Sequence, residues 1–143
     1  MKTLGFIGTG GMGSGMATNL IKAGYRLVVN DLSREQAGGL ERQGAQFADS
    51  PKGVAETCDL VLSMLPNNDA VRAVGLGKEG LAKATTGAKV WIDFSSIDKA
   101  TIVNVCGELG KTGWTVVDAS AGGVEEVAAA GELALWLFGS KAL

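Results

Sequence analysis

The most informative absence from this 143-residue sequence is histidine, which does not occur at all. A Ser-His-Asp triad, a Cys-His pair and a histidine-containing zinc site are therefore excluded. The two cysteines, Cys58 and Cys106, lie far apart and lack metal-ligand spacing, so we interpret them as reduced, buried thiols. From these residue types the sequence predicts no catalytic residue and no metal ligand.

Strong charge and long apolar runs are lacking as well. The chain has 13 basic and 15 acidic residues and a formal net charge of −2, so no field is present to attract nucleic acid or an anionic membrane. No apolar run approaches the ~20 residues of a membrane-spanning helix, and the N-terminus leads into a strand pattern without a secretory-signal layout. These features predict a cytoplasmic protein that binds neither nucleic acid nor membrane.

Glycine, in contrast, is abundant. The 22 glycines are about twice the usual fraction, and they separate apolar segments in the manner of short βα loops. Strands are predicted at residues 2–8, 26–30, 45–47, 59–65, 90–94, 114–118 and 133–138. Helices are predicted over 12–23, 34–43, 68–74 and 98–109, with a small helix from 51 and up to two helical turns within 75–87.

Capping residues support several of these boundaries. Ser33, with Gln36 three residues on, is predicted to open a helix as a capping box, and Ser50 to cap a helix with Pro51 at its first position. Gly24 is predicted to end the first helix. Because the apolar strands alternate with helices, the sequence predicts one α/β domain over residues 1–143, with a doubly wound (Rossmann) parallel sheet.

The first predicted strand runs into a glycine-rich turn with the pattern G-x-G-x-x-G, formed by Gly8, Thr9, Gly10, Gly11, Met12 and Gly13. In such a turn the first glycine permits the sharp bend, the second leaves room for a pyrophosphate, and the third lets the helix pack closely. Amide groups near Gly11 and Met12 would face the phosphate oxygens. The alternative for the hexapeptide alone is a purely structural βα turn.

The end of the second predicted strand supplies a carboxylate in the expected place. Asp31 stands 18 residues after Gly13, close to the spacing at which an acidic residue binds the ribose hydroxyls of a dinucleotide. Its carboxylate would repel the 2′-phosphate of NADP, and Leu32 supplies no cation. The residues therefore favour NAD over NADP, although Arg34 is near enough to keep NADP as the weaker alternative.

The chain resembles the β-hydroxyacid dehydrogenases, a family that includes 3-hydroxyisobutyrate dehydrogenase, tartronate semialdehyde reductase and 6-phosphogluconate dehydrogenase. Residues 5–13 and 16–20 are similar to the opening signature of that family almost residue by residue. The similarity continues at 64–66, 93–97, 118–119, 122–123 and 131–133, and so covers essentially the whole chain.

The resemblance implies where the cofactor binds. Its contacts fall on the glycine turn, on the strand end Asn30-Asp31-Leu32, on Met64-Leu65-Pro66 and on Ser96 with its neighbour Ser95. In NADP-preferring relatives an Asn-Arg-Thr triplet occupies positions 31–33, which this chain lacks. From the residues alone, Pro66 could be a plain strand stop, and the two serines could cap the helix that starts near Asp98 instead.

The chain departs from the family in two places, the substrate loop and the general acid/base. In the family loop Asp-Ala-Pro-Val-Ser-Gly-Gly the serine contacts the substrate carboxylate. Here the loop is Asp118-Ala119-Ser120-Ala121-Gly122-Gly123, which either loses a residue or places Gly122 at the serine position, so Gly122 and Gly123 are the predicted substrate-binding residues. The family's general acid/base is a lysine of a following helical domain, and no lysine here stands in its glycine-rich, lysine and asparagine pattern.

The resemblance therefore implies an NAD-dependent oxidoreductase acting on a small 3-hydroxy acid, represented by its cofactor-binding domain. The helical domain of the family is absent from residues 1–143, so the isolated chain is expected to be inactive. The alternative is a non-catalytic NAD(H)-binding module that works through a partner or as a redox sensor. A homo-oligomer or a separate helical chain that supplies the lysine is a further expectation.

Overall fold

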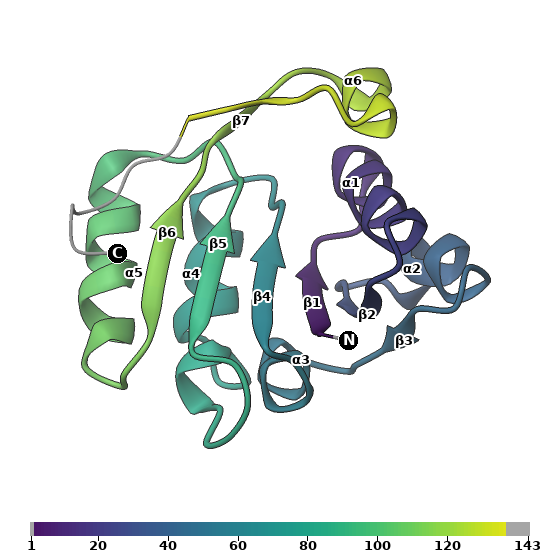
Figure 1. Ribbon diagram of the computed structural model, residues 1–143. Helices are drawn as coiled ribbons and strands as arrows, with labels where there is room; N and C mark the ends of the chain where they lie inside the picture. Colours follow the sequence, from purple (N-terminus) through teal and green to yellow (C-terminus); the bar gives the residue numbers. More distant parts are fainter. Residues whose placement is uncertain (1, 137–143) are drawn as a thin grey trace.

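The computed structural model describes residues 2–136, whose centre is a six-stranded sheet in the order β3-β2-β1-β4-β5-β6 (Figure 1). Every strand pairs in parallel with its neighbours. The strands are β1 (Thr3–Ile7), β2 (Arg26–Asn30), β3 (Gln46–Phe47), β4 (Leu60–Ser63), β5 (Val90–Asp93) and β6 (Thr115–Asp118). The strand order reverses between β1 and β4, which confirms the predicted doubly wound sheet.

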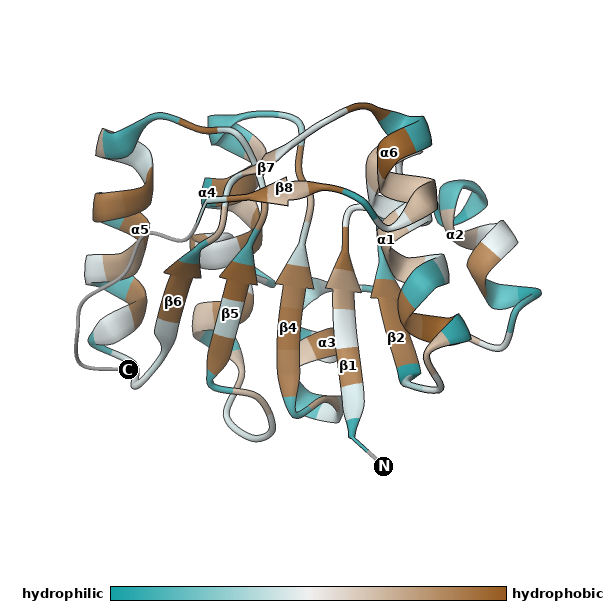
Figure 2. Cartoon of the chain, turned by 45° about the horizontal axis from the view of Figure 1, so that its top comes forward, coloured by the Kyte–Doolittle hydropathy of each residue, from teal (hydrophilic) through white to brown (hydrophobic). Residues whose placement is uncertain are grey.

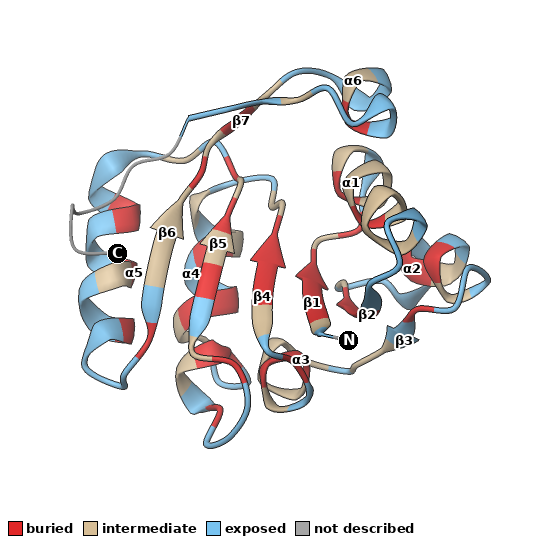
Figure 3. Ribbon diagram, in the orientation of Figure 1, coloured by how far each residue is buried: buried red, intermediate tan, exposed pale blue. Residues whose placement is uncertain are grey.

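Helices cover both faces of the sheet, as the burial of its central strands requires (Figure 3). Side chains alternate across the sheet, so Phe6 joins the core cluster of one face and Ile7 that of the other. The first cluster lies under α1 (Gly11–Lys22) and α2 (Arg34–Glu41). The second lies under α3 (Pro51–Thr57), α4 (Asn68–Leu76), α5 (Lys99–Gly110) and a short 3₁₀ helix, η1 (Leu81–Lys83).

The helix caps agree with the sequence in two cases. The Ser50 hydroxyl accepts a hydrogen bond from the amide of Gly53 at 3.1 Å, with Pro51 beginning α3. Gly24 has a φ of +91° directly after α1 and donates its amide to Ile21 O. Both predictions are confirmed, and the positive φ explains why the chain leaves α1 at a glycine.

The other two capping predictions fare differently. Ser33 stands at the N-cap of α2 as predicted, but its side chain makes no capping hydrogen bond, and its amide donates to the Asp31 carboxylate at 3.1 Å. The second prediction is wrong. Neither Ser95 nor Ser96 caps α5: the carboxylate of Asp98 accepts the amide of Thr101 at 2.7 Å. An aspartate is as good an N-cap as serine and adds a favourable charge at the helix N-terminus.

The last predicted strand does not join the parallel sheet. Within it, β8 (Ala134–Leu135) pairs antiparallel with β7 (Ala121–Gly122), and positions 137 and 138 lie outside the described residues. Between β7 and β8 the chain forms α6 (Glu125–Ala130), which the sequence did not predict. In Figure 2 this helix and the β7–β8 pair cross the edge of the sheet at which the parallel strands end.

Candidate functional site

The glycine turn connects β1 to α1 at the position where the strand order reverses. Gly8 has a φ of +89°, and a Cβ atom there would collide with the backbone oxygen of Met64. A Cβ atom on Gly13 would collide with Gly8 O, so α1 packs against the turn only because both residues are glycine. Gly10 has nothing within 4 Å on its side-chain side. The turn is thus packed on one side and open at Gly10, as a phosphate cradle requires.

Asp31 lies directly beside this turn. Its Oδ2 atom accepts hydrogen bonds from the amide of Thr9 at 2.8 Å and from the Thr9 hydroxyl at 3.2 Å. Its Oδ1 atom accepts the Ser33 amide. The carboxylate therefore joins the glycine turn to the start of α2. The structure places the glycine turn and Asp31 next to each other, although Asp31 follows Gly13 by 18 residues in the sequence.

Arg34, the cation for which NADP remained an alternative, binds other residues of the protein. Arg34 forms an ion pair with Glu41 at 2.8 Å, and its guanidinium lies 5.0 Å from the centre of the Phe47 ring. The ion pair raises the pKa of Arg34 and lowers the pKa of Glu41. Leu32 is fully exposed. The side chain of Arg34 thus contacts Glu41 of α2 and Phe47 of β3. The negative charge of Asp31 at the end of β2 is not paired with Arg34.

Asn30 positions the glycine turn through two hydrogen bonds. Its side-chain amide donates to Ala48 O at 2.8 Å, and its own carbonyl accepts the amide of Gly8 at 3.0 Å. The residue is buried, with 6% of its surface exposed. Its contacts therefore place the first glycine of the turn against β2 and the segment after β3.

A buried polar chain supports the second predicted turn, Met64-Leu65-Pro66. The Ser95 hydroxyl accepts the amide of Leu65 at 2.8 Å and donates to Asp93 Oδ1 at 2.7 Å. The hydroxyl of Ser63 donates to the same oxygen at 2.6 Å. Burial raises the pKa of Asp93, against the lowering effect of these two hydroxyls. Ser95 is thus a buried support of the turn, whereas Ser96 is exposed.

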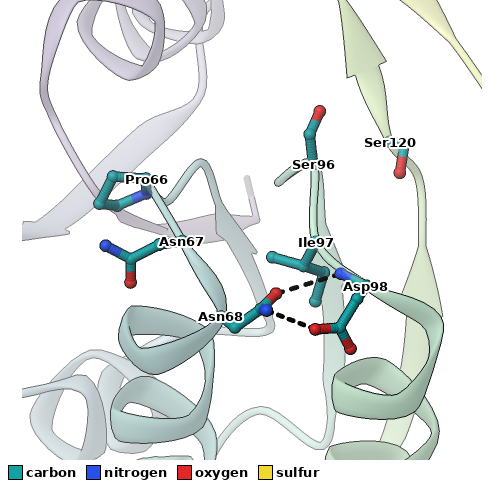
Figure 4. Close-up of a pocket in the computed structure, with 7 residues that line it drawn as sticks. All are labelled: Pro66, Asn67, Asn68, Ser96, Ile97, Asp98 and Ser120. Carbon is teal, nitrogen blue, oxygen red and sulfur yellow. Dashed lines mark hydrogen bonds between the residues drawn. The ribbon is translucent and has the colours of Figure 1, made fainter.

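A cleft of about 540 Å³ opens where β4, β5 and β6 end (Figure 4). This volume is in the range of ~300–1,000 Å³ usual for ligand pockets. Asn68 and Asp98 bridge its floor, since the Asn68 side-chain amide donates to the carboxylate and its oxygen accepts the Asp98 amide at 3.1 Å. The lining residues are Pro66, Asn67, Asn68, Ser96, Ile97, Asp98 and Ser120.

Of these lining residues, the sequence predicted Pro66 and Ser96. Ser120 is not among the predicted site residues, yet it lines the cleft, and its hydroxyl donates to Asp118 at 3.2 Å. Asn67 and Asn68 follow the end of β4, which was the available signal, because ligands of doubly wound sheets bind at the carboxyl ends of the strands. Within residues 2–136 no group of three acidic or cysteine side chains is placed to hold a metal ion.

Gly122 and Gly123 lie in and after β7, beyond the end of β6. Gly123 has a φ of +146°. A Cβ atom on Gly122 would collide with the indole ring of Trp136, which is itself about half exposed. The amide of Trp136 donates to Ser120 O at 3.0 Å. An aromatic ring therefore occupies the space beside Gly122 that a serine side chain would need.

These features together define a dinucleotide-binding domain: a doubly wound sheet, a glycine turn at its reversal point and a carboxylate at the end of the next strand. Residues 3–143 match the model of the NAD binding domain of 6-phosphogluconate dehydrogenase. The chain belongs to this family, the β-hydroxyacid dehydrogenases, and the predicted NAD-binding class is confirmed. No helix of residues 2–136 is of a length and apolarity that would cross a membrane.

Individual relatives agree with this assignment. The chain is 40% identical over 133 residues to a 3-hydroxyisobutyrate dehydrogenase of Pseudomonas aeruginosa, covering 93% of this chain and 45% of the relative. It is 35% identical over 139 residues to an NAD-dependent L-serine dehydrogenase of the same organism, covering 97% and 47%. A solved structure of Mycobacterium tuberculosis 3-hydroxyisobutyrate dehydrogenase with L-serine superposes with a TM-score of 0.89 at 30% identity, covering 99% and 48%. The chain thus spans less than half the length of these relatives.

Proposed function

We propose that this chain is the cofactor-binding part of an NAD-dependent oxidoreductase that acts on a small 3-hydroxy acid. The observation that carries the proposal is the placement of Asp31 beside the open glycine turn, within a family of NAD-binding domains. When bound, NAD supplies the hydride acceptor of the reaction. The glycine turn would hold the pyrophosphate, Asp31 the adenosine ribose, and Ser96 the nicotinamide half.

The preference for NAD follows from the charges around Asp31. The Asp31 carboxylate would lie against the 2′-phosphate of NADP, and the nearby cation, Arg34, is held by Glu41 and Phe47. A phosphate placed there would meet repulsion without a compensating cation. We therefore assign NAD as the cofactor that the site favours.

A small hydroxy acid is the substrate class that the relatives support. Their names refer to 3-hydroxyisobutyrate and to L-serine, which are both short carboxylic acids with a hydroxyl on the third carbon. In this chain Gly122 and Gly123 offer backbone amides to such a carboxylate in place of a serine hydroxyl. Trp136 closes the space beside Gly122, which favours a substrate of small size.

No lysine lines the cleft in the described part of the chain, and the carboxylate of Asp98, which does line it, is already bound by Asn68 and by the amide of Thr101. A positioned acid/base is worth about 10²–10⁴-fold in rate, and the family uses a lysine in a pattern that residues 1–143 do not contain. We therefore propose that residues 1–143 bind NAD(H) but do not turn over a hydroxy acid by themselves.

Calorimetric titration of the chain with NADH and with NADPH tests the cofactor assignment. The wild type is expected to bind NADH more tightly. The triple variant Asp31→Asn, Leu32→Arg, Ser33→Thr should change the ratio of the two affinities by about tenfold or more toward NADPH, because it removes the Asp31 carboxylate and adds an arginine next to the 2′-phosphate. Leu32→Ala alone is the control and should leave the ratio unchanged. Equal affinities in the wild type, or an unchanged ratio in the triple variant, would contradict the role of Asp31.

A further inference from the structure

Helix α6 packs along α1, as both cartoon views show (Figures 1 and 2). Glu125 and Gly11, the first residues of the two helices, are in contact: a Cβ atom on Gly11 would collide with the Glu125 carboxylate. Near the other ends, the Asn19 side-chain amide donates to Ala128 O at 2.9 Å and to Ala129 O at 3.2 Å. The two helices therefore run in the same direction, with their N-termini side by side.

This arrangement gives the Glu125 carboxylate a definite electrostatic role. Each helix N-terminus carries partial positive charge on its unpaired amides. Helix α1 has no acidic residue in its own first turn, and its N-cap, Gly10, has no side chain to accept an amide. Glu125 forms no ion pair with a lysine or arginine of residues 2–136. The exposed Glu125 carboxylate thus lies at the N-terminus of α1 without a cation partner among the described residues.

The start of α1 is also where the pyrophosphate of a dinucleotide binds in this class of fold. A pyrophosphate in that place would come close to the Glu125 carboxylate, and both are anions. From this geometry we infer that Glu125 is an affinity-determining residue of the cofactor site: an internal anion that weakens the binding of the dinucleotide. The inference rests on the proposed cofactor role of residues 8–13 and concerns a residue outside that turn.

The substitution Glu125→Gln removes the charge and keeps the shape of the side chain. Repulsion between solvent-exposed charges a few ångströms apart corresponds to about a fivefold change in a binding constant. Glu125→Gln should therefore bind NADH about fivefold more tightly than the wild type. Glu126→Gln is the matched control, because Glu126 lies in the same first turn of α6, whereas the atoms nearest to the side-chain position of Gly11 all belong to Glu125.

The experiment is a calorimetric titration with NADH of the wild type, Glu125→Gln and Glu126→Gln at low and at high salt. The inference requires that Glu125→Gln alone gains affinity and that its advantage shrinks at high salt, where charge repulsion is screened. Equal gains in both variants would show a general effect of net charge and overturn it. So would no gain, or a loss, which would mean that Glu125 helps to bind the cofactor. If the wild type binds no NADH at any salt concentration, the cofactor site itself fails, and the inference fails with it.

Discussion

Asp93 is a carboxylate without solvent contact at the end of β5. Its Oδ1 atom receives two hydroxyl donors, from Ser63 and Ser95, whereas its Oδ2 atom has no partner in the described part of the chain. A buried charge with one unpartnered oxygen is costly, and this cost is the reason that the pKa of Asp93 is raised. Asp93 nonetheless supports the Leu65 turn through Ser95.

Substitutions at Asp93 should separate its charge from its hydrogen bonds. Asp93→Asn keeps an oxygen for the Ser63 and Ser95 hydroxyls and removes the charge, so this variant should be at least as stable as the wild type at pH 8. Asp93→Ala leaves both hydroxyls without an acceptor and should lose about 1–3 kcal/mol for each unpaired donor. Urea unfolding of the three proteins measures the difference.

The pH dependence of the stability tests the charge of Asp93 in a second way. A carboxyl whose pKa is raised on folding takes up a proton in the native state before it does so in the unfolded chain. The destabilisation by Asp93 is therefore present above its raised pKa and is relieved as the pH falls toward its ordinary range. The stability difference between Asp93→Asn and the wild type should shrink as the pH is lowered from 8. A difference that stays constant with pH would contradict the charge argument.

At the scale of elements, the parallel sheet was predictable because its strands carry their own signal. Strands β1 and β4 are buried on both faces, so they appear in the sequence as nearly continuous apolar runs bounded by glycine or proline. Helix α6 gave no such signal. It has six residues, half of them alanine, which form no apolar stripe. The local signals for this helix were the two glutamates in its first turn and Gly131, which ends it with a φ of +76°.

The candidate site also has a part that the sequence predicts and a part that it does not. The glycine turn and Asp31 were predictable because strand, turn, helix and strand follow one another in sequence, and their spacing reports their geometry. The cleft was predictable only in part. Asn68 and Asp98 meet because α4 and α5 start beside each other after neighbouring strands, and Ser120 arrives from β6. Such contacts depend on strand order, which single-sequence patterns do not record.

Asn19 should control the docking of α6. Its side-chain amide satisfies two carbonyls of α6, so Asn19→Ala removes both hydrogen bonds and should weaken the docking by about 1–3 kcal/mol. The amides of residues 125–131 should then exchange with deuterium faster, while those of β1 and β4 keep their rates. Asn104→Ala, at an exposed position of α5, is the control for an Asn→Ala change in a helix. Unchanged exchange in α6 would contradict the role of Asn19.

At the scale of the whole molecule, the site is assembled from two halves of the sheet. Gly8 to Gly13 and Asp31 follow β1 and β2, whereas Pro66, Ser96 and Ser120 follow β4, β5 and β6. The two halves meet at β1 and β4, where Met64 donates its amide to Ile7 O at 3.0 Å. A dinucleotide that spans the reversal point would contact both halves, so its binding should stabilise the domain as one unit.

Thermal unfolding with NADH tests this coupling. A ligand at 100 times its dissociation constant stabilises the native state by about 2.7 kcal/mol, which for a domain of this size raises the melting temperature by roughly 5–10 °C. Asp31→Ala would remove one proposed cofactor contact from the first half, and Ser96→Ala one from the second. At the same free NADH concentration both variants should show a smaller shift than the wild type, in a single cooperative transition. If only Asp31→Ala lowers the shift, NADH is held by the first half alone. A shift that neither substitution changes would place NADH outside the site that these two residues flank.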